Sequence, residues 1–219
     1  FSGAGDLYAY ASFGSRLSGL YRVDTGTGAA TLVGDSGQSL QDLAWNPVTN
    51  TMYGVNTTVP NVATIYSVNL ADGSTSAVGN VVGLPAVNLE VGLAVDSAGR
   101  FFVHDIASDT IYRTDAGLNV TASIVLSRNT NFSQGMTIDW SRDDAGYHAA
   151  IGNSPAFFSR LFGFDTSLTG WNDLGDFGAA DGTFPTVEGG DLAIRPVPAP
   201  GALALLGLGS LAATRRRRA

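Results

Sequence analysis

The sequence contains no cysteine and no lysine, and only two histidines among its 219 residues. Without cysteine the chain forms neither a disulfide framework nor a thiolate zinc site, and it has no cysteine nucleophile. It also lacks the Gly-x-Ser-x-Gly elbow of many serine hydrolases. These absences exclude several catalytic sites that can be recognised from sequence alone.

Negative charge dominates the chain once its last residues are set apart. The formal net charge is −7, from 12 basic and 19 acidic residues. All the basic residues are arginine, and four of them are consecutive at the C-terminus, so the preceding body has 8 arginines against 19 acidic residues and a charge of −11. Because such a body repels phosphate backbones, nucleic acid is not an expected partner.

The C-terminal residues form three consecutive parts of different composition. An almost wholly apolar stretch from Gly201 to Thr214 lies between a proline-containing motif and an arginine cluster. The motif and the cluster are Val197, Pro198, Ala199, Pro200 and Arg215, Arg216, Arg217, Arg218. The apolar stretch has 14 residues, whereas a full transmembrane helix needs about 20. We expect a short apolar helix that anchors the chain to a membrane, with the arginines on the cytoplasmic side.

This three-part order resembles the PEP-CTERM sorting tail, which is found on exported proteins of Gram-negative bacteria that make extracellular polymer. The resemblance covers residues 197–219 and departs from the commonest motif at Ala199, where that motif has glutamate. It implies a protein that is exported to the cell envelope or the extracellular space, transiently held at the membrane, and processed by an exosortase. It does not imply a ligand.

The body of the chain repeats a short pattern at a regular spacing. Each copy has an aromatic residue, an acidic or amide residue shortly after it, and then a glycine-containing turn or a threonine-rich run. The aromatic residues are Tyr21, Tyr66, Tyr112 and Phe162, which are 45, 46 and 50 residues apart. A second set precedes them, at Leu43–Pro47, Leu93–Ser97, Met136–Trp140 and Leu192–Pro196. Periods near 45 residues with several short strands each are typical of a β-propeller.

The sequence therefore predicts an all-β fold, a propeller of four-stranded blades over residues 1–196, followed by the sorting tail. In the first complete repeat the expected strands are Leu40–Asn46, Thr51–Asn56, Thr64–Leu70 and Ser74–Val78. In the N-terminal repeat they are Leu7–Ala11, Gly19–Asp24 and Ala29–Val33.

Two arrangements of the ends fit the repeats. The segment Asp191–Pro196 reads as an innermost strand and could complete the N-terminal blade of a four-bladed ring. The segment Phe1–Tyr8 also aligns with Val95–Phe102, which would place Phe1 inside an innermost strand of a larger propeller. We favour the larger propeller, because an exported protein should begin with a methionine and a signal sequence.

Acidic or amide residues come at or shortly before the expected innermost strands. They are Asp42, Glu90, Gln134, Glu188 and Asp191. A convergent ring of oxygen ligands at the mouth of the channel could bind calcium, which prefers six to eight oxygens. We take Asp42, Glu90, Glu188 and Asp191 as the candidate ligands, although they do not recur at one strand offset. The alternative is that these side chains accept hydrogen bonds from amides of neighbouring blades.

The remaining candidates are aromatic residues and histidines. Trp171, expected in the loop Thr169–Asp173, is the candidate for stacking on a sugar, while Trp45 and Trp140 lie in expected innermost strands and should pack between blades. His104 and His148 are expected in second strands, as structural histidines. His104 and Asp105 point to opposite faces of a strand and do not form a pair.

Three functions remain open on these grounds. The first is an exported, non-catalytic propeller in the envelope or matrix that binds carbohydrate, such as extracellular polysaccharide, or protein. The second is a calcium-dependent hydrolase, similar to the lactonase-like propellers, that uses the channel mouth. A third is a matrix protein without a specific ligand.

Overall fold

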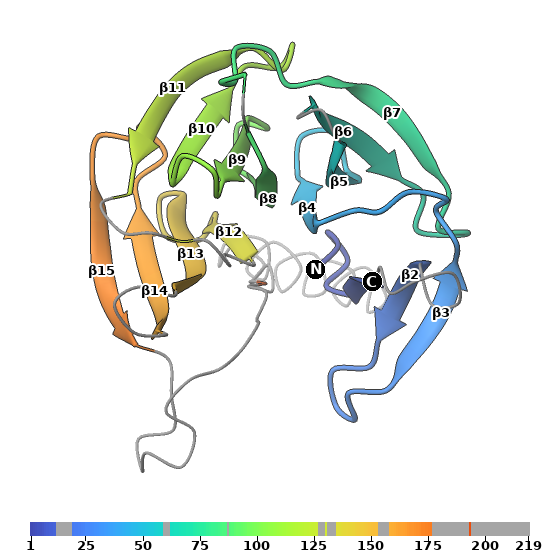
Figure 1. Ribbon diagram of the computed structural model, residues 1–219. Helices are drawn as coiled ribbons and strands as arrows, with labels where there is room; N and C mark the ends of the chain where they lie inside the picture. Colours follow the sequence, from blue (N-terminus) through green and yellow to red (C-terminus); the bar gives the residue numbers. More distant parts are fainter. Residues whose placement is uncertain are drawn as a thin grey trace, which may run out of the picture.

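The computed structural model describes residues 1–11, 19–58, 62–86, 88–126, 130, 135–152, 158–176 and 193. All regular structure in these residues is β-strand, arranged as four antiparallel sheets around a common centre (Figure 1). The predicted all-β propeller arrangement is confirmed, and the four visible repeats form its described blades. The predicted C-terminal apolar helix and its arginine tail lie outside the described residues.

The strands follow one another within each blade from the centre outward. The first blade has three described strands, β1 (Leu7–Ala11), β2 (Gly19–Val23) and β3 (Ala30–Gly34). The second has β4 (Asp42–Asn46), β5 (Thr51–Thr58), β6 (Val62–Val68) and β7 (Thr75–Asn80). The third has β8 (Glu90–Val95), β9 (Phe101–Asp105), β10 (Thr110–Thr114) and β11 (Val120–Val125). The fourth has β12 (Gly135–Asp139), β13 (Ala145–Gly152), β14 (Phe158–Phe164) and β15 (Trp171–Asp176).

The two repeated patterns mark equivalent strands. The four repeated aromatic residues lie in β2, β6, β10 and β14, which occupy the same place in each blade. The second set supplies the innermost strands β4, β8 and β12, which lie nearest the middle of Figure 1. Of its fourth copy only Ala193 is described, and it is exposed and outside any strand, whereas Ala44 and Ala94 are buried in innermost strands. The other residues of the innermost strand predicted at Asp191–Pro196 lie outside the described residues, so this strand stays a prediction.

Side-chain oxygens at the strand ends hold the turns. Asp24, Asp115 and Asp165 each follow the strand with the repeated aromatic residue and accept backbone N–H groups of the next turn at 2.8–3.5 Å. Asn69 does the same in the second blade, through the amide of Ala71. Because an Asp or Asn side chain replaces a backbone acceptor in such turns, the recurring acidic residue of the sequence pattern has a structural role.

The first residues of the chain form the same turn that follows an innermost strand elsewhere. The amide of Ser2 donates to the carbonyl of Asp6 at 2.8 Å, as the amide of Asp96 donates to the carbonyl of Arg100 at 3.1 Å. The side chain of Ser2 accepts the amide of Asp6, as that of Asp96 accepts the amide of Arg100. The local alignment of Phe1–Tyr8 with Val95–Phe102 is therefore confirmed.

The hydrophobic core lies between the blades. Three clusters of buried side chains are each shared by consecutive blades: Leu20 with Met52 and Val68, Ile65 with Leu93 and Val103, and Ile111 with Met136 and Phe164. Hydrogen bonds reinforce them, for example from the indole nitrogen of Trp140 to the carbonyl of Val95 at 2.8 Å. None of the three clusters joins the fourth blade to the first.

Two backbones approach closely where the first blade meets the second. Gly34 ends β3 and packs on the turn at Asp72-Gly73, and a Cβ atom at Gly34 would overlap the carbonyl oxygen of Asp72. Gly73 has a φ of 76°, in the region that favours glycine. The hydroxyl of Thr75 donates to the carbonyl of Ser36 at 3.1 Å in the same contact. Glycine is therefore required at position 34 by the neighbouring blade.

We predict that Gly34→Ala lowers the free energy of unfolding by about 1–3 kcal/mol, because the added methyl group must displace the backbone of the second blade. Gly26→Ala is the matched control, since a Cβ atom there would be no closer than 3.4 Å to the Asp24 carboxyl. Urea denaturation of the two variants makes the comparison. Equal losses for both would contradict this account of the interface.

Candidate functional site

Asp42 and Glu90 begin adjacent innermost strands, β4 and β8, as the channel-mouth prediction requires. Both side chains are buried. One carboxyl oxygen of Asp42 accepts the amide of Leu93 in the next blade at 2.6 Å, and the other accepts the amide of Leu43 at 2.6 Å. Asp42 therefore fits the alternative to a calcium site, in which these side chains accept amides of a neighbouring blade. The amide of Leu93 lies in an innermost strand and has no further strand to pair with.

Glu90 has a different environment. Its Oε2 accepts the hydroxyl of Thr57 at 3.3 Å, and the same hydroxyl also reaches the carbonyl of Glu90 at 2.9 Å. Its Oε1 is buried and has no hydrogen-bond partner among the described residues. Burial, together with the negative charge of Asp105, raises the pKa of the Glu90 carboxyl to about 7. Glu90 is thus a buried acid that titrates near neutrality.

The described residues do not by themselves form a calcium site. No group of three or more His, Asp or Glu side chains within them could hold a metal ion. Both Asp42 oxygens are engaged by amides, so of the two described candidates only Glu90 has an uncommitted carboxyl oxygen. Glu188 and Asp191 lie outside the described residues, as does Gln134. The four-carboxylate calcium site therefore stays a prediction.

The two histidines meet between the third and fourth blades, an association that the sequence interpretation missed. His104 in β9 and His148 in β13 are both completely buried, and their Nδ1 and Nε2 atoms lie 3.2 Å apart. They are separated by 44 residues, close to one repeat period, and this spacing was the available signal. Consecutive blades pack face to face, so two residues about one repeat apart can meet between them.

The histidines extend into a chain of hydrogen bonds. The hydroxyl of Thr130 donates to the carboxyl of Asp109 at 2.6 Å, so its oxygen is left to accept from His104 Nε2, 3.2 Å away. That tautomer leaves His104 Nδ1 to accept from His148 Nε2. Burial lowers the pKa of His104 well below its usual value and that of His148 to about 3. The pair is neutral and serves to join the blades.

All three tryptophan side chains pack on other side chains of the blades. Trp171 is the first residue of β15, so the predicted loop position is wrong: the extended run Trp171–Asp176 pairs with β14. Its ring is partly buried and contacts the ring of Phe162 edge-on, with centroids 5.5 Å apart. Trp140 and Trp45 pack between blades, as expected. Stacking of a sugar on Trp171 stays a prediction.

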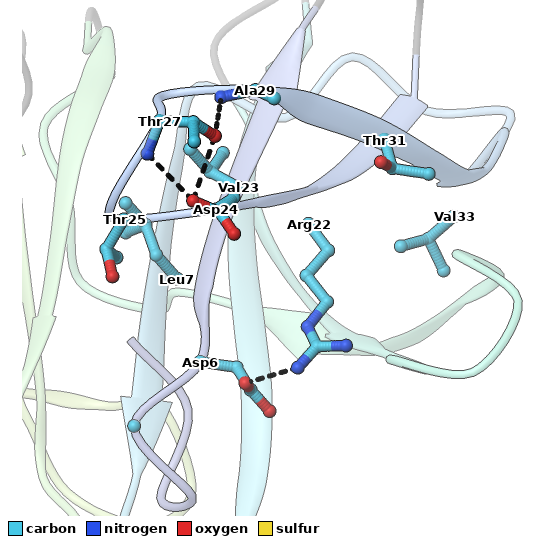
Figure 2. A pocket seen from close by; sticks show the side chains of 11 residues that line it. Asp6, Leu7, Arg22, Val23, Asp24, Thr25, Thr27, Ala29, Thr31 and Val33 are labelled. Carbon is cyan, nitrogen blue, oxygen red and sulfur yellow. Dashed lines mark hydrogen bonds and ion pairs between the residues drawn. The ribbon is translucent and has the colours of Figure 1, made fainter.

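A hollow of about 680 Å³ lies over the first blade (Figure 2). Its lining includes Leu7, Val23 and the threonines of the β2–β3 turn. Arg22 and Asp6 also line it and form an ion pair at 2.6 Å, with 61% and 37% of their side chains exposed. The carboxylate of Asp24 accepts hydrogen bonds from the backbone amides of Gly26 and Thr27. The hollow is open, and its charged groups are paired or hold the turn.

The fold and the sequence together define a β-propeller protein with a C-terminal sorting signal. Residues 196–218 match the PEP-CTERM protein-sorting motif, one residue earlier at each end than the predicted tail. The motif indicates an exported protein that is processed by an exosortase, with membrane association at its C-terminus. No helix within the described residues is long and apolar enough to cross a membrane.

Several solved structures resemble the chain at low sequence identity. A virginiamycin B lyase from Staphylococcus aureus is 12% identical with a TM-score of 0.46, over 71% of this chain and 48% of the lyase. A gluconolactonase from Xanthomonas campestris is 15% identical with a TM-score of 0.44, over 71% and 56%. TolB from Acinetobacter baumannii is 16% identical with a TM-score of 0.47, over 79% and 41%. The chain thus spans about half the length of these proteins. No curated protein has a significantly similar sequence.

We predict that Glu90→Gln makes the protein more stable than the wild type at pH 8 but not at pH 4.5. The folded-state pKa is raised from 4.5 to about 7, so the stability that the protonated carboxyl provides is complete below pH 4.5 and is lost as the pH rises to about 7. The variant should therefore match the wild type at pH 4.5 and exceed its free energy of unfolding by up to about 3 kcal/mol at pH 8.

Urea denaturation between pH 4.5 and 8 measures this difference. Asp35→Asn, which removes an exposed carboxyl, is the matched control and should follow the wild-type curve. A constant offset between Glu90→Gln and the wild type at all pH values would contradict the raised pKa.

Proposed function

We propose that the chain is a non-catalytic propeller that acts in the cell envelope or the extracellular matrix. The sorting motif at residues 196–218 carries this proposal, because such a tail delivers its protein to the bacterial surface. An exosortase is the proposed processing partner, and the apolar segment Gly201–Thr214 is the proposed membrane contact before processing. The blades then form a rigid body on the outside of the cell.

The use of the polar side chains supports a binding or structural role. Among the described residues, the buried acids Asp42, Asp96 and Asp105 accept backbone amides at 2.6–3.1 Å. The two histidines are buried between blades and bonded to each other. A general base must reach its substrate, and neither histidine has access to solvent.

Extracellular polysaccharide is the proposed ligand class. Trp171 would supply part of the apolar surface that sugars stack on, since its ring is partly exposed at the start of β15. The negative charge of the body favours a neutral or cationic polymer over an anionic one, because like charges repel.

We predict that removal of residues 197–219 converts the protein from membrane-held to freely secreted in a host that has an exosortase. The physical reason is that the tail contains the longest apolar segment and the only arginine cluster of the chain. Fractionation of cells and medium, followed by immunoblotting, measures the distribution. Replacement of Arg215–Arg218 by serine tests the cluster separately. Identical fractionation of full-length and truncated proteins would overturn the sorting assignment.

A calcium-dependent hydrolase is the second candidate, and Glu90 is the observation that favours it. Its buried Oε1 has no hydrogen-bond partner among the described residues, and a carboxylate oxygen of this kind is a suitable calcium ligand. For this function we predict that calcium raises the melting temperature by several degrees, that EDTA reverses the rise, and that Glu90→Gln abolishes it. Differential scanning fluorimetry measures the shift. The non-catalytic proposal expects no shift and no hydrolysis of lactone or ester substrates.

A further inference from the structure

The outermost strand of each blade ends its sheet at the rim of the molecule (Figure 1). In three blades this outer edge is interrupted at the same place. An extra residue stands there opposite the repeated aromatic position and the residue before it, which makes a β-bulge. The extra residues are Val33 in β3, Val78 in β7 and Leu174 in β15. A bulge twists its strand locally and discourages pairing of the edge with another chain.

The outer strand of the third blade, β11, has no extra residue at this place. Ile111 and Tyr112 pair directly with its consecutive residues Ile124 and Ser123, and its register shift lies closer to its start. The sequence of β11 contains no glycine, proline or charged residue, whereas glycine follows the bulge in the other outer strands, at Gly34, Gly79 and Gly175. The last part of β11 is therefore a regular edge that lacks the features which discourage pairing.

A neighbouring hydrogen bond determines which backbone groups of β11 point outward. The amide of Leu126, just after the strand, donates to the carbonyl of Asp109, just before β10, at 2.8 Å. Because hydrogen-bonded and non-hydrogen-bonded pairs alternate along an antiparallel ladder, Ile124 also faces β10. Ser123 and Val125 then direct their N–H and C=O groups away from the sheet. Both side chains are exposed, that of Val125 by 64%.

The start of the same edge already accepts an extended segment. Val82, in the connection between the second and third blades, forms a parallel bridge with Asn119. Its amide donates to the carbonyl of Leu118, and its carbonyl accepts the amide of Val120, both at 2.9 Å. Among the residues that the structure describes, no segment pairs with this edge beyond Val120. The outward groups of Ser123 and Val125 are thus open to a further strand.

We propose that this edge pairs with the same edge of a second copy of the chain, antiparallel about a twofold axis at Ile124. In this register Ser123 of one molecule lies opposite Val125 of the other, on both sides of the axis. These are the residues whose backbone groups point outward, so each facing pair exchanges N–H···O=C bonds. The two third blades become one continuous sheet, and the isologous contact closes as a dimer.

Charge and symmetry favour a second copy as the occupant. Twofold pairing sets Ile124 against itself, so a charged residue there would meet a like charge across the contact. The body of the chain has a charge of −11, from 8 arginines and 19 acidic residues, yet β11 carries none of it. The outer strand β15, by contrast, includes Asp173 and Asp176. An edge that receives a different chain can carry charges complementary to that chain, whereas an edge that receives itself cannot.

The position of the contact is independent of both ends of the chain. The third blade lies between two described blades, which cover its faces and leave its outer edge at the rim. Pairing would also shield the side chain of Val125, because the side chains of facing residues in antiparallel strands lie next to each other.

Cysteine cross-linking tests the register, because the chain has no cysteine of its own. Full-length Ser123→Cys and Val125→Cys are purified separately in detergent, mixed and oxidised. We expect the mixed disulfide to form at least about tenfold faster than either disulfide between identical variants, because only the mixed pair lies within disulfide reach. Val78→Cys, exposed on the bulged edge of β7, mixed with Val125→Cys is the matched control.

Proline at position 123 provides the second measurement. It removes an outward N–H and no hydrogen bond to β10, and edge strands tolerate proline at such positions. Full-length Ser123→Pro should weaken self-association by at least about tenfold in sedimentation velocity over a range of concentrations, since the facing carbonyl loses its donor. Ser123→Ala retains the N–H and should sediment as the wild type does. Circular dichroism checks that both variants fold, and the sorting tail is present in both, so association through the tail would be unchanged.

Three results would overturn the proposal. One is a wild-type chain that sediments as a monomer at every concentration, as expected if another segment of the same chain or a different protein occupies the edge. Another is a mixed disulfide that forms no faster than the disulfides between identical variants or with the Val78→Cys control. The third is equal self-association of Ser123→Pro and Ser123→Ala.

Discussion

The constraint on which the structure depends is that a blade cannot bury its own two faces. An antiparallel sheet in the middle of a propeller is apolar on both sides, so each face needs a neighbour. The innermost strand adds a second demand, because its inward amides have no further strand to pair with. Asp42 meets part of that demand by reaching from one blade to the amide of Leu93 in the next. Side-chain packing and edge hydrogen bonds thus join the same pairs of blades.

This constraint also accounts for much of the unusual composition. The carboxylates of Asp24, Asp115 and Asp165 accept backbone N–H groups of turns, and that of Asp42 accepts an N–H of an innermost strand. Each has a polar task that lysine or arginine could not perform, because only an acceptor can bind a backbone N–H. The negative charge of the body therefore follows largely from the way in which this chain builds its turns, and it does not by itself indicate a cation site.

The sequence was sufficient to predict the elements that depend on local pattern. The strand Leu7–Ala11 has the predicted bounds, and the repeated aromatic residues occupy equivalent strands because spacing alone determines blade equivalence. Properties that arise only between blades could not be predicted. The raised pKa of Glu90 depends on burial by a neighbouring blade, and the contact of His104 with His148 depends on how two sheets face each other. The sequence predicts a loop at Thr169–Asp173, whereas β15 already begins at Trp171 because its backbone pairs with Phe164 of β14.

The sharing of core clusters between consecutive blades has a consequence for how the molecule opens. Among the described residues, the second and third blades each take part in two of the three clusters, whereas the first and fourth take part in one. Stability in such a chain of units is close to a sum of nearest-neighbour contributions. Amide hydrogens of β1–β3 and β12–β15 should then exchange with solvent through partial openings that leave the central blades intact. Among the described strands, protection from exchange would then be highest in β4–β11.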